Sequence, residues 1–193
     1  MFIQTEHTPN PEVLKFLPGR EVMGEGSREF RDADEGQASP LARELFAING
    51  VSRVFFGPEF LTVTKAGPAI DWGHLKAPIL AAVMDHFTSG QPLFSGDGAS
   101  DEATSHDGEV YEGETAQIVA EIKDLLDTRI RPAVAQDGGD ILFSRFDAST
   151  GVVFLHMKGA CSGCPSSSAT LKAGVENMLK HYVPEVTGVE QTL

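Results

Sequence analysis

Alternation of apolar and polar residues predicts four strands in the first half of the chain, and two helical stretches complete the pattern. The predicted strands lie at residues 2–6, 13–16, 51–56 and 60–65. Apolar residues recur at helical intervals from Pro40 to Ile48 and from Asp71 to Thr88, and a glycine follows each stretch as a stop. Residues 20–39 show little periodicity, and their middle is predicted to be loop. The pattern therefore predicts a small N-terminal domain with the order ββαββα.

The second half of the chain also contains strand-like alternation and helical spacing of apolar residues, in a different order. A helix is predicted to begin near Thr115, and Pro132 is expected to break or kink it. A glycine-rich turn at 136–140 leads into two predicted strands, and a second amphipathic helix is followed by one more strand. These strands lie at 141–146, 152–157 and 186–193, and the second helix lies at 166–180. The predicted order is αββαβ, and the fold class is α+β with two small domains.

Charge separates the two halves. The formal net charge is -13, and residues 93–114 contain seven acidic side chains and no lysine or arginine among several glycines. Such a self-repelling segment is typical of a flexible linker, so we predict domains at 1–92 and 115–193 joined by an acidic linker at 93–114. The acidic balance argues against nucleic acid as a partner. No run approaches the roughly 18 apolar residues of a membrane span, so a soluble protein without a membrane partner is expected.

The chain contains two cysteines, Cys161 and Cys164, which lie where the predicted strand 152–157 gives way to a helix. Two cysteines are too few for a disulfide framework, which favours a reducing, intracellular compartment. Backbone N–H groups and the positive end of a helix dipole favour thiolates at such a junction. The flanking Gly159 and Gly163 let backbone amides approach a large anion. The loop is suited to hold charge on sulfur, either as a redox couple or as half of a metal site.

Ligand counting favours a shared metal site. An iron–sulfur cluster or a structural zinc typically takes four ligands, whereas this chain offers two cysteines. A Cys161 and Cys164 pair from each of two chains would complete the set at a two-fold axis. A thioredoxin-like thiol–disulfide oxidoreductase needs more chain after the motif. A zinc-stabilised interaction module completed by His156 and His181 lacks a typical ligand spacing. Both alternatives, and that of two idle thiols, stay open at this point.

Several segments together resemble a known family. Residues 122–134, 136–141 and 159–167 resemble the C-terminal NifU-like domain of Nfu proteins. Residues 2–6, 10–11 and 15–19 resemble the N-terminal domain of the mitochondrial and alphaproteobacterial type of Nfu protein. The similarity covers nearly the whole chain outside the linker. The Asp-Gly-Gly-Asp motif followed by Cys-Ser-Gly-Cys-Pro is highly specific in this order, whereas the cysteine motif alone is weak.

The resemblance implies a carrier or scaffold rather than an enzyme. Cys161 and Cys164 would bind a cluster between the subunits of a homodimer, usually [4Fe–4S] with [2Fe–2S] as the second option. The cluster would come from an upstream assembly scaffold and pass to apo iron–sulfur proteins. The absence of an Arg-rich leader favours the bacterial cytoplasm, and a mature form in the mitochondrial matrix is the alternative. The stretch Asp137–Asp140 is interpreted as a turn rather than as part of the cluster site.

Overall fold

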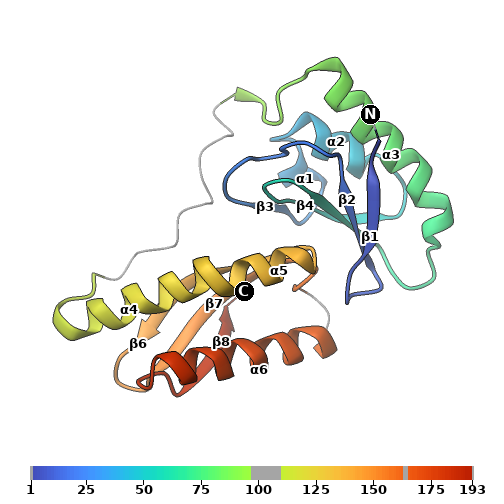
Figure 1. The fold of residues 1–193 in the computed structure, drawn as a ribbon. Coiled ribbons are helices and arrows are strands. Elements are labelled where there is room, and N and C mark those ends of the chain that lie inside the picture. The colour runs from blue at the N-terminus through green and yellow to red at the C-terminus, as the bar shows by residue number, and fades with distance from the viewer. Residues whose placement is uncertain (1, 97–109, 163–164, 193) are drawn as a thin grey trace. The chain divides into compact units, whose positions relative to one another are not determined.

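The computed structural model describes residues 2–96, 110–162 and 165–192, with only the backbone for 165–168. The chain forms two compact units, Met1–Ala103 and Thr104–Leu193 (Figure 1). Each unit contains its own sheet and its own hydrophobic core. The predicted α+β class with two sheet-containing domains is confirmed.

The N-terminal unit is built on a five-stranded antiparallel sheet in the order β1-β2-β5-β4-β3. The strands are β1 Gln4–His7, β2 Val13–Leu17, β3 Arg28–Phe30, β4 Val51–Phe56 and β5 Leu61–Lys65. The helices are α1 Ala33–Gly36, α2 Pro40–Phe46 and α3 Trp72–Ser89. Apolar side chains of α2 and α3 share one buried cluster with alternate residues of the sheet. The burial of apolar surface between these two layers stabilises the unit.

Local sequence sets the bounds of the two longer helices. The Ser39 hydroxyl accepts a hydrogen bond from Ala42 N at 3.2 Å, and a proline occupies the first turn of α2. Asp71 caps α3 by accepting from Gly73 N at 2.8 Å, and Gly90 ends the helix with a φ of 69°. Both helices agree with the predicted ranges to within one or two residues.

Residues 20–39, whose middle was predicted to be loop, contain two short elements that the sequence pattern did not indicate. β3 pairs with β4 at the edge of the sheet and buries Phe30 completely. α1 is a single turn, capped by Asp32, whose carboxylate accepts from Asp34 N and Glu35 N. The prediction of loop was wrong for these residues because three or four residues are too few to show a period.

Both ends of the predicted linker contact a domain core. Leu93 and Phe94 pack against the N-terminal cluster, and Ser95 N donates to Ala38 O at 2.9 Å. At the other end, Tyr111 packs against the C-terminal cluster, and its hydroxyl accepts from Phe146 N at 2.8 Å. Residues 97–109, which carry much of the acidic charge of this segment, lie outside the described residues.

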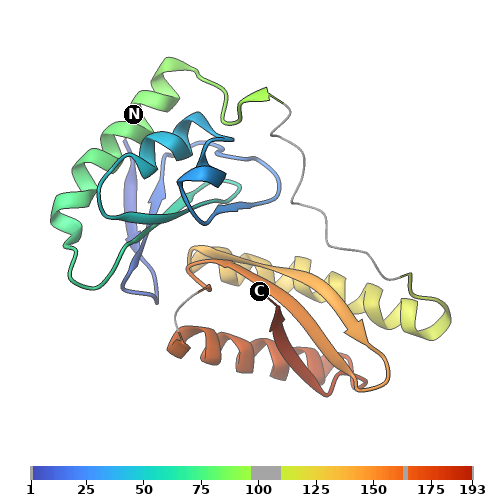
Figure 2. The same ribbon diagram turned by 180° about the vertical axis from the view of Figure 1, so that it is seen from behind.

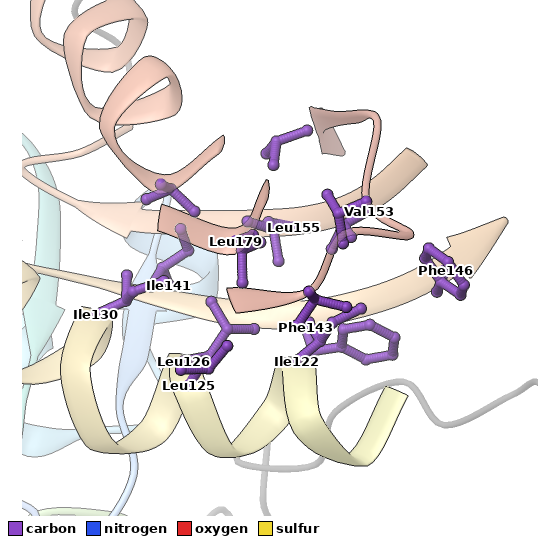
Figure 3. Close-up of a cluster of buried hydrophobic side chains, with 14 of the residues drawn as sticks. Ile122, Leu125, Leu126, Ile130, Ile141, Phe143, Phe146, Val153, Leu155 and Leu179 are labelled. Carbon is purple, nitrogen blue, oxygen red and sulfur yellow. The ribbon is translucent and has the colours of Figure 1, made fainter. Parts of the chain in front are cut away.

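The C-terminal unit has three strands in the order β6-β7-β8, with β6 and β7 antiparallel and β7 and β8 parallel. The strands are β6 Gly139–Asp147, β7 Val152–Gly159 and β8 Gly188–Thr192. Its helical segments are α4 Gly113–Leu125, the π-helical η2 Leu126–Ile130, α5 Arg131–Gln136 and α6 Pro165–Tyr182. The helices lie in front of the strands in Figure 1 and behind them in Figure 2. Figure 3 shows side chains of α4 and η2 directed toward those of β6 and β7 in one core.

The first helix of this unit continues past Pro132 instead of breaking there. The five residues before Arg131, which make up η2, form a π-helical turn, and Arg131 N donates to Leu126 O. Proline lacks an N–H and would clash with the carbonyl four residues earlier in a regular α-helix. The helix widens to a π-helical turn directly before the segment that contains Pro132. α4, η2 and α5 therefore form one continuous helical rod that ends beside the start of β6.

Within the described part of the chain, every helix is too short or too polar to cross a membrane.

His86 makes the stability of the N-terminal unit sensitive to acid. It is 2% exposed on α3, and its Nδ1 has no hydrogen-bond partner among the described residues. Burial lowers the pKa of His86, although Glu44 opposes this shift. The unfolded chain therefore takes up this proton at higher pH than the folded unit does. The contribution of His86 to stability is fully present above its ordinary pKa of 6.5. It is lost as the pH falls from there toward the lower pKa that His86 has in the folded unit.

We expect the unfolding temperature of the N-terminal unit to fall between about pH 8 and pH 5, and His86→Leu to reduce this dependence. Trp72 is the only tryptophan and lies in this unit, so its fluorescence follows the transition. His74→Gln, a change at an exposed residue of the same helix, is the control. An unchanged pH dependence in His86→Leu would contradict the assignment.

Candidate metal centre

The cysteine loop follows directly from the end of β7. Gly159 turns the chain with a φ of 66°, and Ala160 N donates to Gly138 O at 3.1 Å. Ser162 closes the turn by donating from N and from Oγ to Gly159 O, at 3.1 and 2.9 Å. These bonds hold Cys161 next to the start of β6, ahead of α6. Gly163 and Cys164 lie outside the described residues.

Cys161 lies in the protein interior. Its side chain belongs to the C-terminal core cluster, and the residue is 5% exposed. Gly139, which pairs with Gly159 in the β6–β7 ladder, leaves the space that the sulfur fills. A Cβ added at Gly139 would lie 2.8 Å from Lys158 O and closer still to Cys161 Sγ. We call this contact between Gly139, Lys158 O and Cys161 the cysteine seat.

The environment of the seat keeps Cys161 protonated. Burial raises the pKa of the Cys161 thiol to about 12, and the carboxylates of Asp137 and Asp140 contribute to the rise. The position of Cys161 ahead of a helix predicts a thiolate favoured by the helix dipole and nearby amides, but the raised pKa shows that this prediction was wrong. Burial and two acidic neighbours outweigh those effects here. A metal bound at this sulfur would have to displace the proton.

A charged side-chain pair lies next to the seat. Arg131, the first residue of α5, donates from Nε and Nη2 to the two carboxylate oxygens of Asp140, at 2.9 and 3.1 Å. Asp140 is 7% exposed and also accepts from Ile141 N at 2.8 Å. The hydrogen bonds to Asp140 raise the pKa of Arg131, which therefore stays charged. The second acidic residue of the Asp-Gly-Gly-Asp motif thus pairs with an arginine from the preceding helix.

The histidines considered as zinc ligands are engaged elsewhere. His156 Nδ1 lies 2.9 Å from Thr192 Oγ1 between β7 and β8. His181 stacks edge-on against Tyr182 near the end of α6. Over the ranges that the structure describes, no three His, Cys, Asp or Glu side chains gather as a metal site. These positions give no support to a zinc site that His156 and His181 complete.

The arrangement holds the sulfur of Cys161 in a defined place, and Cys164 follows it in the same loop. A buried thiol with a raised pKa reacts slowly as a nucleophile, because the thiolate is the reactive form. Sulfur is nevertheless a strong ligand for iron once the proton is lost. The chemistry of Cys161 therefore fits metal binding better than thiol–disulfide exchange.

Sequence reasoning missed two contributors to this site. Gly139 and Arg131 are distant from the cysteines in sequence, and only the β6–β7 register and the helical rod bring them together. The Asp-Gly-Gly-Asp motif was the available signal, although it was interpreted as a turn. In the structure, Gly139 and Asp140 are already part of β6.

Comparisons with known proteins identify the family of both domains. Residues 3–90 match the family described as scaffold protein Nfu/NifU N terminal, and residues 122–190 match the NifU-like domain. The chain is 54% identical to NifU-like protein 5, mitochondrial, of Arabidopsis thaliana, covering 99% of this chain and 68% of that protein. It is 50% identical to the human NFU1 iron-sulfur cluster scaffold homolog, mitochondrial, covering 100% and 72%.

Among solved structures, the chain is similar to the solution NMR structure of a NifU-like protein from Saccharomyces cerevisiae. The identity is 28%, the match covers 49% of this chain and 85% of that one, and the TM-score is 0.45.

Fold and site together define a two-domain α+β protein with a cysteine loop between a strand and a helix of its C-terminal domain. Within that class, the chain belongs to the Nfu/NifU-like family of iron–sulfur cluster scaffold proteins. The resemblance found in the sequence is thereby confirmed, and an iron–sulfur cluster is the cargo that the family implies.

Proposed function

We propose that the protein holds one [4Fe–4S] cluster between two copies of the chain and passes it to apo-proteins. Cys161 and Cys164 of each copy are the ligands. The observation that carries this proposal is the cysteine seat, which fixes one of the chain's two cysteines beside a glycine that leaves room for the sulfur. The protein acts by binding and release and is not an enzyme.

The ligand count supports sharing between copies. A cluster of this kind takes four cysteine ligands, and one chain supplies two. A two-fold arrangement gives each copy the same role. A site held by a contact between subunits opens when the subunits separate, which suits temporary storage and transfer. A [2Fe–2S] cluster satisfies the same count and is the second option for the cargo.

The proposed partners follow from this role. An upstream assembly scaffold would donate the cluster, and apo iron–sulfur proteins would receive it. The names of the Arabidopsis and human relatives place those proteins in mitochondria. Between the two compartments considered, the bacterial cytoplasm and the mitochondrial matrix, these names support the second.

Iron and acid-labile sulfide analysis of the anaerobically reconstituted protein tests the proposal. We expect about two irons and about two sulfides per chain, which corresponds to one [4Fe–4S] cluster per pair. Stoichiometric zinc without sulfide would support the zinc-stabilised interaction module instead. Disulfide reductase turnover by the apo-protein, with no iron uptake, would support the oxidoreductase. The burial of Cys161 argues against this last outcome.

A further inference from the structure

The Arg131–Asp140 pair connects the helical rod to the strand that carries the cysteine seat. Asp140 directly follows Gly139, and its Oδ1 accepts from both Arg131 Nε and Ile141 N. The arginine uses its planar fork to hold both carboxylate oxygens. Such bidentate pairs restrict geometry more than single contacts do. The carboxylate of Asp140, which also accepts from the backbone of Ile141, therefore ties the start of β6 to α5.

The π-helical turn determines where Arg131 lies. An extra residue in the turn before Arg131 rotates the rest of the rod relative to α4. Arg131 Nη1 also reaches back to Asp127 Oδ1, at 2.9 Å, on the exposed side. The guanidinium of Arg131 thus pairs with two carboxylates. Asp127 is exposed, whereas Asp140 is largely shielded from solvent.

We propose that Arg131 and Asp140 are positioning residues for Cys161. Their bidentate pair fixes the start of β6, and the fixed Gly139 then keeps the sulfur in the cysteine seat. The inference deepens the proposed function, because it names residues that set the geometry of each half of the shared site. Neither residue is a ligand. Loss of the pair lets the start of β6 move away and exposes Cys161 to solvent.

The test measures alkylation of Cys161 by iodoacetamide in the apo-protein. The full-length chain carries Cys164→Ser, so that Cys161 is the one thiol. Arg131→Met keeps an unbranched apolar stem but removes the fork and the charge. We expect alkylation at least about tenfold faster than in the parent, which corresponds to about 1.4 kcal/mol in the free energy of local opening.

The direction of the change separates positioning from simple electrostatics. If Arg131 acted only through its charge, its removal would leave Asp140 uncompensated and disfavour the thiolate, and alkylation would become slower. Positioning predicts faster alkylation. Arg131→Lys keeps the charge without the fork, and we expect an intermediate rate from it. This variant also keeps the test decisive if Arg131→Met does not fold.

Asp127→Asn is the matched control. It removes the exposed contact of Arg131 and leaves the bidentate pair with Asp140 in place, so we expect the parental rate. Rates for Arg131→Met and Arg131→Lys that are equal to or below the parental rate would overturn the proposal. The assay needs no cluster, so its outcome is independent of whether the protein holds iron. The same Arg131 variants, made in the chain that keeps both cysteines, are then reconstituted, and their iron content reports on the proposed function separately.

Discussion

Alanine at Gly139 is expected to displace Cys161 from the cysteine seat and to leave the reconstituted protein with little bound iron. The added Cβ would overlap Cys161 Sγ and approach Lys158 O to 2.8 Å. Because that carbonyl belongs to a paired strand, the sulfur is the group that must move. Overpacking of this kind costs about 1–3 kcal/mol. Iron and sulfide per chain, with the unfolding temperature of the C-terminal unit, are the measurements.

Gly174→Ala is the control for this substitution. Gly174 lies within α6, and nothing lies within 4 Å of a Cβ added there. Alanine at an open helical position is favourable by up to about 1 kcal/mol, so we expect unchanged iron content and equal or higher stability. Parental iron content in Gly139→Ala, with Cys161 now open to alkylation, would show that the seat has no role in cluster binding.

Serine at either cysteine is expected to abolish cluster binding altogether. A serine hydroxyl stays protonated near neutral pH and is a poor ligand for iron, whereas its size is close to that of the thiol. Since one chain supplies two ligands, each substitution removes two of the four in a symmetric pair. Visible absorbance and sulfide content of Cys161→Ser and Cys164→Ser after anaerobic reconstitution test this expectation.

Far-UV circular dichroism serves as the control for folding in the two serine variants. Cys161→Ala adds a second control, because it leaves no unpartnered hydroxyl in the core. A single serine variant that retains the parental cluster would exclude the substituted cysteine as a ligand.

Long elements with a clear period were predictable from sequence. α3 and the β4–β5 hairpin were found because apolar residues recur over many positions and because capping residues mark the ends. β3 and α1 were missed because three or four residues are too few to show a period, and β3 depends on packing as well. Tertiary contacts, such as the burial of Phe30 against the core, decide short elements of this kind.

The site was predictable only as far as it is contiguous in sequence. The cysteine motif at 161–164 predicted a site with sulfur ligands, and the count of two cysteines per chain predicted that two chains share it. The protonation of Cys161 depends on burial and on Asp137 and Asp140, which no local pattern reports. Arg131 reaches the site through the π-helical turn, a feature that the proline in the sequence indicated only as a break or a kink.

The mass of the reconstituted protein under anaerobic, non-denaturing conditions tests the central claim most directly. The shared site predicts a native mass spectrum with a species of two chains plus one [4Fe–4S] cluster, while Cys164→Ser gives no cluster-bound dimer. The cluster and the dimer should be lost together when oxygen is admitted. A single chain that carries an intact cluster would contradict the account.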